Sequence, residues 1–332
     1  MPKASLFPEA HDEFASAADL LRAQGEVAVV AHVRPDADAV GSACALAAGL
    51  NQIGVQAKAY IGQPLPHSAN LRTVPGVEDI AYGDPVPAGA FVVTVDCASI
   101  DRTGGHQELI EADPSRVLVI DHHATNPGFG GHNLIVESES TTAMVRELFF
   151  HLGVELDYEL AYQLYAGLVT DTGSFRWGTP RMHVLAAELM AHGLNTRQIA
   201  LDLMDTMSAV DLQLMGAVLA ETQVLPVKGL TLAIITIATP VLARMSQTTV
   251  EAIIDYARSL EGTDVGVVFK EQAPGYWAAS LRSTAIDASA VAKTLGGGGH
   301  HAAAGYSAAG RREDIVRALV DALPDTTAPA NA

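Results

Sequence analysis

The chain has 332 residues, of which 49% are hydrophobic and 17% charged, and its formal net charge at pH 7 is -18. This length exceeds what one ordinary hydrophobic core holds, so we expect two domains, and the apolar content excludes an intrinsically disordered protein. The acidic charge excludes a protein that binds the phosphate backbone of long DNA or RNA, since such proteins need a stripe of Lys and Arg.

Apolar runs of strand and helix length alternate along the first half of the chain. The expected strands are 26–33 (EVAVVAHV), 55–60, 91–95 and 117–120. The expected helices are 39–53, 141–152 and 158–170. Such alternation predicts an α/β domain in which a parallel sheet is flanked by helices.

A mostly helical stretch at 181–222, with a break at 193–195, precedes a second series of elements. Strands are expected at 230–238, 264–271 and 276–282, and a helix at 249–260. This pattern predicts a second, smaller α/β domain. The expected organisation is a metal-binding catalytic domain at 1–195, a helical connector at 196–225, a substrate-binding domain at 226–324 and a disordered tail at 325–332.

The sequence predicts neither membrane insertion nor secretion. No apolar stretch approaches the length of a membrane span, and the N-terminal sequence MPKASLFPEAHDEF lacks the apolar core of a signal peptide. Cys44 and Cys97 are too few for a disulfide framework and lie in apolar surroundings, which predicts buried free thiols. We therefore expect a cytoplasmic protein.

Four acidic or histidine-containing clusters follow apolar runs in the first half of the chain. They are HVRPDAD at 32–38, Asp96, Asp121-His122-His123, and DTGSF at 171–175. A single strand-end Asp is usually a cap, and a single His is usually a core residue. Four such clusters together predict a site for two metal ions, which can activate water and neutralise a phosphoryl group. Carboxylates and imidazoles without thiolates favour Mn²⁺ or Mg²⁺ over structural zinc.

The second domain contains the segment GGGGHHAAAG at 296–305. The glycines alone indicate a flexible loop followed by the start of a helix. Ordering four consecutive glycines is costly, however, unless bare backbone must approach something closely, so His300 beside exposed N–H groups fits a cradle for a phosphate or base. Arg282, at the end of a strand, fits a phosphate clamp and a surface charge equally well.

The motifs resemble those of a known enzyme superfamily. His32 to Ala43 (HVRPDADAVGSA), Asp96, the Asp121-His122-His123 triplet and Asp171 resemble the four motifs of the DHH phosphoesterase superfamily. GGGGHHAAAG resembles the glycine-histidine motif of the DHHA1-type C-terminal domain. Their combination over nearly the whole chain is similar to the bifunctional oligoribonuclease and pAp phosphatase (nanoRNase) group. The resemblance implies hydrolysis of short oligoribonucleotides, including pApA, to mononucleotides, and of pAp to AMP.

The resemblance also implies roles for individual residues. It implies two Mn²⁺ ions, for which Mg²⁺ or Co²⁺ could substitute. The implied ligands are His32, Asp36 and Asp96 for one ion, and Asp38, Asp96, His122 and Asp171 for the other. His123 would face the substrate phosphate and Asp121 would orient the histidine pair. The implied substrate-binding residues are Arg282, Gly298, Gly299 and His300, with Arg102 and Ser174 lining the cleft. Asn126 fits a turn as well as the site.

Several alternatives stay open or are weakened by the sequence. A cyclic di-AMP phosphodiesterase would use the same chemistry, and the sequence does not separate the two activities. An inorganic pyrophosphatase would need a basic Ser-Arg-Lys-Lys-type cluster, and a RecJ-like exonuclease a longer chain. A nucleotide-binding sensor without catalysis would have lost a metal ligand, and none is lost here.

The expected partners are short RNA, dinucleotides and pAp, with no long nucleic acid and no membrane. The apolar segment 184–222 and the family resemblance favour a homodimer.

Overall fold

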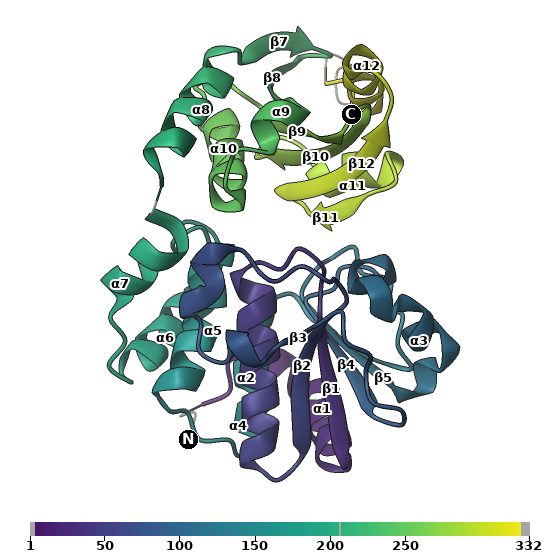
Figure 1. Cartoon of the computed structure of the whole chain (residues 1–332), viewed down its shortest axis with the longest axis vertical. Coiled ribbons are helices and arrows are strands. Elements are labelled where there is room, and N and C mark those ends of the chain that lie inside the picture. The colour runs from purple at the N-terminus through teal and green to yellow at the C-terminus, as the bar shows by residue number, and fades with distance from the viewer. Residues whose placement is uncertain (1–3, 206, 327–332) are drawn as a thin grey trace, which may run out of the picture. The chain divides into compact units, whose positions relative to one another are not determined.

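The computed structural model describes residues 4–205 and 207–326. The chain divides into two compact units, residues 1–206 and 207–332. Each unit has its own six-stranded sheet and its own hydrophobic cores (Figure 1). The segment 196–225, expected as a helical connector, contains two helical stretches of the first unit and the first helix and strand residues of the second.

The sheet of the first unit is entirely parallel, as predicted. Its strands are β1 (Glu26–Ala31), β2 (Gln56–Ile61), β3 (Ala81–Tyr82), β4 (Phe91–Val95), β5 (Val117–Asp121) and β6 (His132–Ile135). Their order is β3-β2-β1-β4-β5-β6. Every residue of β4 and β5 is buried, which is expected when helices or loops cover both faces of a parallel sheet.

Seven α-helices belong to the described part of the first unit. They are α1 (His11–Arg22), α2 (Ala37–Gln52), α3 (Gln107–Ala112), α4 (Thr141–Leu152), α5 (Tyr158–Asp171), α6 (Pro180–Met190) and α7 (Thr196–Ala200). Short 3₁₀ helices lie at η1 (Pro8–Ala10), η2 (Ala69–Thr73), η3 (Val77–Asp79), η4 (Ile100–His106) and η5 (Pro114–Arg116), and a π-helix at η6 (Leu201–Asp205). Figure 1 shows α2, α4 and α5 on one side of the sheet and α3 on the other.

The alternation of side chains along β1 explains this layering. Val27 and Val29 pack into the large core that contains α1, α2, α4 and α5, whereas Ala28 and Val30 pack into a smaller core with Ile110 of α3. The chain runs from β1 outward to β2 and β3, then returns to place β4 on the opposite side of β1. At such a reversal the loops after neighbouring strands diverge, and ligands bind at the carboxyl ends of those strands.

The second unit has a mixed sheet. Its elements are α8 (Ala209–Ala220), β7 (Gln223–Val227), β8 (Leu230–Ile237), α9 (Thr239–Leu242), α10 (Gln247–Ser259), β9 (Val265–Ala273), β10 (Tyr276–Ser283), α11 (Ala288–Thr294), β11 (Gly298–His300), β12 (Ala303–Ala309) and α12 (Arg312–Ala322). The strand order is β11-β12-β10-β9-β8-β7, and only β8 and β9 run parallel. Helices α11 and α12 pack on one face, and α8 and α10 on the other.

The glycine-rich segment differs from the flexible loop and helix start that its composition indicates. Residues 298–300 and 303–309 form the antiparallel pair β11–β12. A Cβ atom at Gly297 would lie 2.1 Å from the Gly305 carbonyl oxygen, and one at Gly299 would lie 2.5 Å from the Ala303 carbonyl oxygen. At least these two glycines are therefore required by close approach to the neighbouring strand of the same unit.

Three further expectations concern the whole chain. Cys44 and Cys97 are buried and free, as predicted. Of the predicted disordered tail, residues 327–332 lie outside the described part, while the Thr326 N–H donates to the Lys228 carbonyl oxygen at 2.9 Å. Among the described residues no single helix is long and apolar enough to cross a membrane, although one bent pair, Thr196–Asp205 with Ala209–Ala220, has the length and composition.

Candidate metal centre

Three neighbouring parallel strands deliver the first members of the site to one edge of the sheet. His32 follows β1, Asp96 follows β4, and Asp121 ends β5 immediately before His122. Asp96 has a positive φ of 59°, which is rare for a residue with a side chain, and its N–H donates to the Ile120 carbonyl oxygen at 3.1 Å. Backbone strain of this kind persists where the surrounding structure holds a functional side chain in place.

One group of donors consists of His32, Asp36 and Asp96. The His32 Nε2 lies 3.6 Å from Asp36 Oδ2 and 3.5 Å from Asp96 Oδ2. The other oxygen of Asp36 caps α2, accepting the N–H groups of Asp38 and Ala39 at 3.1 and 3.0 Å. The helix cap therefore fixes this carboxylate in the group.

A second group of donors surrounds His122. Its Nε2 lies 3.3 Å from Asp171 Oδ2, 3.5 Å from Asp96 Oδ1 and 3.9 Å from Asp38 Oδ2. Asp171 is the last residue of α5, and Asp38 lies in the first turn of α2. The structure thus brings all six sequence-predicted ligands together, in two sets.

Asp96 belongs to both sets through different oxygens. Its Oδ2 faces His32 and its Oδ1 faces His122. The Thr141 hydroxyl also donates to Oδ1, at 3.1 Å, and limits rotation of the carboxylate. A carboxylate that presents one oxygen to each of two donor groups has the arrangement of a bridging ligand between two cations.

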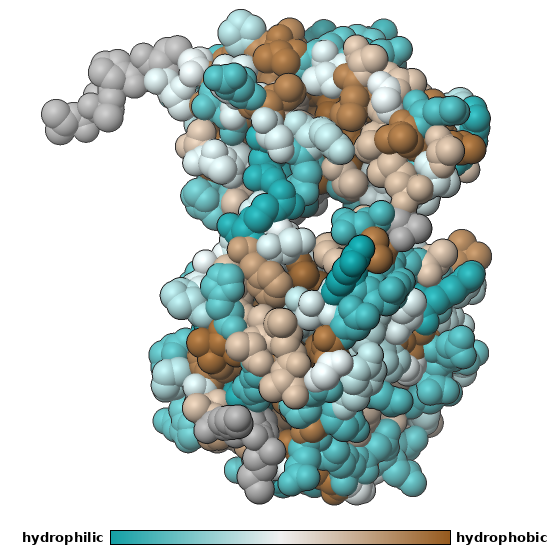
Figure 2. All heavy atoms as spheres, turned by 90° about the vertical axis from the view of Figure 1, so that its left-hand side faces the viewer, coloured by the Kyte–Doolittle hydropathy of each residue, from teal (hydrophilic) through white to brown (hydrophobic). Residues whose placement is uncertain are grey.

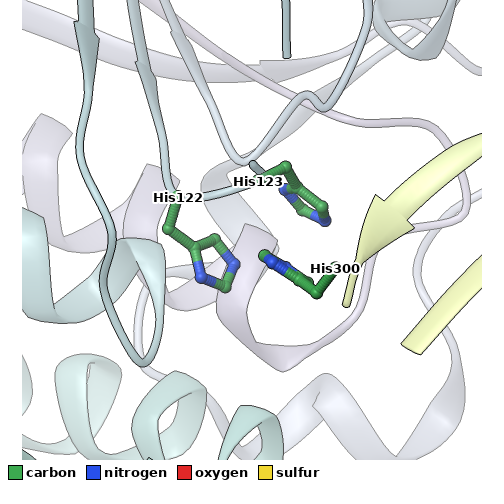
Figure 3. A group of neighbouring side chains, drawn as sticks. All are labelled: His122, His123 and His300. Atoms are coloured by element: carbon green, nitrogen blue, oxygen red, sulfur yellow. The ribbon is translucent and has the colours of Figure 1, made fainter. Parts of the chain in front are cut away.

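The two histidines present the same ring nitrogen to the carboxylates. The Nδ1 of His32 lies 2.9 Å from the Val33 carbonyl oxygen, and the Nδ1 of His122 lies 3.1 Å from the Ser138 carbonyl oxygen. Because a carbonyl oxygen only accepts, the His122 Nδ1 carries a proton, whereas the His32 Nδ1 also has the Arg102 Nη2 donor 2.8 Å away. In each ring it is Nε2 that faces the carboxylates. Figure 3 shows the His122 ring beside that of His123, with ring centroids 4.8 Å apart.

Asp38 is held by the start of another helix. Its Oδ2 accepts the Thr141 N–H at 2.7 Å, and its Oδ1 accepts the Thr142 N–H at 2.9 Å and the Thr142 hydroxyl at 2.7 Å. The partial positive charge at the N-terminus of α4 stabilises the carboxylate. Gly167 of α5 makes room, because a Cβ atom there would lie 2.3 Å from Asp38 Oδ1.

The electrostatics of the site indicate that positive charge is required. Burial and the charges of Asp171 and Asp96 raise the pKa of Asp38 well above its ordinary value. Burial lowers the pKa of His122, but Asp171 and Asp96 outweigh this effect and raise the pKa well above its ordinary value. Burial and the charge of Arg102 lower the pKa of His32, but Asp36 and Asp96 outweigh both effects and raise that pKa to about 9. Protons thus compensate the clustered carboxylates, a role that divalent cations would take over.

Comparison with known proteins identifies the family. The family models "DHH family, N-terminal domain" and "DHHA1 domain" match residues 26–168 and 235–325. A bifunctional oligoribonuclease and PAP phosphatase NrnA from Thermus thermophilus is 33% identical over 287 residues, which cover 84% of this chain and 83% of the relative. The chain belongs to the DHH family. As a DHH protein it is a phosphoesterase, and members of this class depend on metal ions.

Two other similar proteins cover almost the whole chain. A probable bifunctional oligoribonuclease and PAP phosphatase NrnA from Streptococcus mutans is 27% identical, over 91% of this chain and 96% of the relative. The crystal structure of an exopolyphosphatase-related protein from Bacteroides fragilis superposes with a TM-score of 0.81, at 24% identity, over 94% of this chain and 96% of that one. The latter likeness shows a shared fold.

The DHH triplet itself forms a hydrogen-bonded chain. Asp121 Oδ1 accepts the His123 Nδ1–H at 2.8 Å and the His122 backbone N–H at 2.9 Å. Asp121 is completely buried, whereas the His123 side chain is 23% exposed. Asp121 therefore fixes the His123 ring with its Nδ1 proton inward, which leaves Nε2 as the nitrogen able to act on a substrate.

Asn126, which the sequence fits to a turn as well as to the site, has contacts of both kinds. Its Oδ1 accepts the Gly128 N–H at 2.9 Å, as in a turn, while its Nδ2 donates to Asp121 Oδ2 at 2.6 Å and to the Cys97 carbonyl oxygen at 3.0 Å. Asn126 is buried and thus serves both as a turn residue and as a partner of Asp121. The short separation between Asp121 and Asn126 in the sequence is a signal for this contact. A turn directly after a strand can bring a nearby polar side chain back to the end of that strand.

Arg102 and Ser174, both expected to line the cleft, have different neighbours. The Arg102 Nη2 lies 2.8 Å from His32 Nδ1, and the Val33 N–H donates to the Arg102 carbonyl oxygen at 2.8 Å. Ser174 is exposed, and its hydroxyl lies 3.7 Å from the Met204 sulfur. Arg102 therefore lies next to the His32 group. The Ser174 hydroxyl instead contacts Met204, which belongs to η6.

The remaining sequence-predicted residues belong to the second unit. Arg282 lies near the end of β10, and its Nη1 donates to the Leu281 carbonyl oxygen at 3.0 Å. Gly298, Gly299 and His300 form the edge strand β11. Arg282 pairs with Ala303 of β12, which in turn pairs with His300, so these residues share one end of the sheet.

Proposed function

We propose that this DHH phosphoesterase hydrolyses short oligoribonucleotides, including pApA, to mononucleotides, and pAp to AMP. The observation that carries the proposal is the Asp96 carboxylate, which faces the His32 group with one oxygen and the His122 group with the other. The names of the Thermus and Streptococcus relatives support the choice of substrates. The net charge of -18 supports a short substrate, because an acidic surface repels long polyanions.

The proposed ligand sets follow the two donor groups. The first set is His32, Asp36 and Asp96, and the second is Asp38, Asp96, His122 and Asp171. Oxygen and imidazole donors without thiolates favour two Mn²⁺ ions, with Mg²⁺ or Co²⁺ as substitutes. When bound, the ions supply charge neutralisation at the phosphoryl group and activation of water.

The protein's own residues would perform the remaining steps. His123 would face the phosphoryl group through Nε2 and hold a proton there for the departing ribose oxygen, while its Nδ1–H stays bonded to Asp121. The Asn126 amide would keep Asp121 oriented. In the second unit, Arg282 and His300 with the backbone of Gly298 and Gly299 would bind the part of the nucleotide remote from the scissile bond.

The direct test is a substrate panel. Purified protein with Mn²⁺ is incubated with pApA, pAp, cyclic di-AMP, a short RNA, a long RNA and pyrophosphate, and the products are separated by chromatography. We expect turnover of pApA, pAp and the short RNA, and little of the long RNA. Preferential turnover of cyclic di-AMP would instead favour the phosphodiesterase alternative, and turnover of pyrophosphate alone would refute the proposal.

A kinetic comparison tests the division of roles between the units. His300→Ala should raise KM for pApA about ten- to a hundredfold, while KM for bis-p-nitrophenyl phosphate stays nearly unchanged. His123→Ala should lower kcat for both substrates, because it would act on the phosphoryl group itself. If His300→Ala lowered activity equally on both substrates, GGGGHHAAAG would have a structural role and would not bind the nucleotide.

We also propose a homodimer. In the first unit, Val184 and Met190 of α6 are 58% and 47% exposed, and in the second unit Val210 and Leu212 of α8 are 51% and 58% exposed. The only charged residue within α8 is Asp211, which is buried. Figure 2 shows brown hydrophobic residues among the white and teal ones on the surface of each unit. A second copy is the occupant that the family resemblance favours.

A further inference from the structure

The segment that follows α5 is a rigid turn. Gly173, Ser174 and Phe175 all have positive φ values, of 55°, 61° and 63°. The turn is held by hydrogen bonds from the Ser174 N–H to the Val169 carbonyl oxygen at 2.8 Å and from the Arg176 N–H to the Thr172 carbonyl oxygen at 2.9 Å. Such a conformation is unfavourable for Phe, so the surrounding structure must enforce it.

The turn directs one aromatic ring inward and another outward. The ring of Phe175 lies 6.0 Å from that of Tyr165 and 5.8 Å from that of His183, and it packs against the main core. Trp177, two residues later, remains 39% exposed, and Arg176 is exposed beside it. Phe175 thus anchors the turn while Arg176 and Trp177 face outward.

The outward pair is fixed in place. The Trp177 Nε1–H donates to the Asp171 carbonyl oxygen at 3.0 Å, and a Cβ atom at Gly173 would lie 2.1 Å from the Trp177 ring. The Arg176 guanidinium lies 4.8 Å from the centre of the indole, and its Nε donates to the Gly173 carbonyl oxygen at 2.6 Å. An aromatic surface with a cation stacked on it is therefore formed before any ligand arrives.

The location of this pair connects it with the metal centre. Asp171, whose carbonyl oxygen accepts the indole N–H, has its carboxylate 3.3 Å from His122 Nε2. A substrate phosphate held at that centre would have its nucleoside within reach of the nearby protein surface. With only 20 Lys and Arg against 38 Asp and Glu, the chain has few charges to spare for gripping RNA, so stacking is the available source of affinity that tolerates any base.

We infer that Arg176 and Trp177 form a stacking platform for a nucleobase of the substrate, adjacent to the phosphate that is hydrolysed. This inference rests on the proposed function, because it assumes a nucleotide substrate. The ligand class is a nucleobase, since its flat π-face matches the indole and guanidinium and its phosphate would lie at the metal centre. Two competing roles exist for Trp177, as a support for Asp171 alone or as a contact for another protein.

The kinetic test compares two substrates that differ only in the base. Adenosine 3′,5′-bisphosphate is compared with the corresponding abasic ribose bisphosphate. We expect Trp177→Ala to raise KM for the adenosine compound about 5- to 150-fold, as measured for the loss of one base–aromatic stack, and to leave KM for the abasic compound unchanged. Trp177→Phe, which keeps a ring but loses the N–H, should stay close to wild type.

Tyr158→Ala provides the matched control. Tyr158 is also an exposed aromatic residue, at 48%, but it begins the 14-residue helix that Asp171 ends, about 20 Å away. Its replacement should leave both KM values unchanged. The inference is wrong if Trp177→Ala affects both substrates equally, if Trp177→Phe is as impaired as Trp177→Ala, or if neither variant changes KM, which would leave Trp177 for a protein partner.

A binding measurement separates this inference from the proposed function. A non-hydrolysable phosphorothioate dinucleotide that contains 2-aminopurine is titrated with protein and Mg²⁺, and its fluorescence is recorded. Wild type should quench the emission by stacking, and Trp177→Ala should not. Quenching by a protein that hydrolyses none of the panel would refute the proposed function and support the platform. Hydrolysis without a difference in quenching between the two proteins would refute the platform.

Discussion

Asp96 is the residue on which both donor groups depend, since each of its carboxylate oxygens faces a different histidine. Burial raises the pKa of Asp96, but hydrogen bonds with His122 and His32 outweigh burial and hold that pKa well below its ordinary value. The carboxylate is therefore kept ionised, as a metal ligand must be. Its positive φ at the end of β4 shows that the fold accepts a strained backbone in order to place it.

We predict that Asp96→Ala abolishes hydrolysis and leaves the fold intact. The substitution removes the shared ligand and relieves repulsion among the clustered carboxylates, but it also removes the partner of the Thr141 hydroxyl, of His32 and of His122, so we expect the protein to fold with a lowered melting temperature. Asp38→Ala should also abolish hydrolysis but cost more stability, because three donors at the start of α4 lose their acceptor. Turnover of pApA and thermal melts check both; a folded Asp96→Ala protein with near wild-type turnover would contradict the two-metal assignment.

The pair formed by Asp121 and Asn126 permits an exchange experiment. Asn126→Asp alone would place two carboxylates where Nδ2 and Oδ2 are now 2.6 Å apart, and should destabilise the protein. Adding Asp121→Asn should restore the melting temperature in part, because one carboxylate and one amide again face each other while the Cys97 carbonyl oxygen still lacks its donor. Turnover should remain reduced about 10²- to 10⁴-fold, since His123 would then lack its carboxylate partner. Recovery of both stability and turnover would show that Asn126 and Asp121 act only in packing.

Helix α5 approaches the site closely at Gly167. Gly167→Ala would favour the helix by about 1 kcal/mol through propensity, but its Cβ would lie 2.3 Å from Asp38 Oδ1 and 2.5 Å from Thr142 Cγ2. We predict weaker Mn²⁺ binding by calorimetric titration and reduced turnover. Gly216→Ala in α8 is the control, because nothing lies within 4 Å of its added Cβ; it should gain about 0.5–1 kcal/mol of stability and keep full metal affinity. Equal metal affinity in both variants would contradict the prediction.

The elements differ in how far the sequence predicts them. The apolar runs at 91–95 and 141–152 predict a strand and a helix, and both occur with those bounds. Strand β7 is not predicted because it is an exposed edge strand with Pro226 inside it and no alternation of apolar residues. The sequence does not predict strand β11 because glycine normally weakens strands. Glycine is required in this segment only because the chain passes close to β12.

The candidate site shows the same division. Strand-end positions predict that His32, Asp96 and Asp121 lie at one edge, because parallel strands end together. The hydrogen bonds from Thr141 and Thr142 to Asp38 join residues more than a hundred positions apart. No local sequence pattern predicts such contacts. The contact between Asn126 and Asp121 depends on a buried turn, whose course a sequence pattern does not specify.

At the scale of the whole molecule, the exposed apolar side chains of α6 and α8 lead to a prediction about assembly. We expect light scattering at micromolar concentration to give twice the monomer mass of 34.7 kDa. Leu212→Glu should weaken the dimer because it places a charge on an apolar, 58% exposed position. Tyr276→Glu, at an exposed position on β10 of the same unit, serves as the control. A protein that scatters only as a monomer would refute the homodimer.

The separate cores of the two units make metal binding a local source of stability. The four described core clusters each lie within one unit, and all six proposed ligands belong to the first. A ligand stabilises only the cooperative unit that binds it, by about 2.7 kcal/mol when its concentration is a hundred times its Kd. Removing Mn²⁺ with a chelator should therefore lower one of two calorimetric transitions and leave the other in place. The protein would then lose its proposed catalytic unit to metal depletion or proteolysis while the unit proposed to bind the nucleotide stays folded.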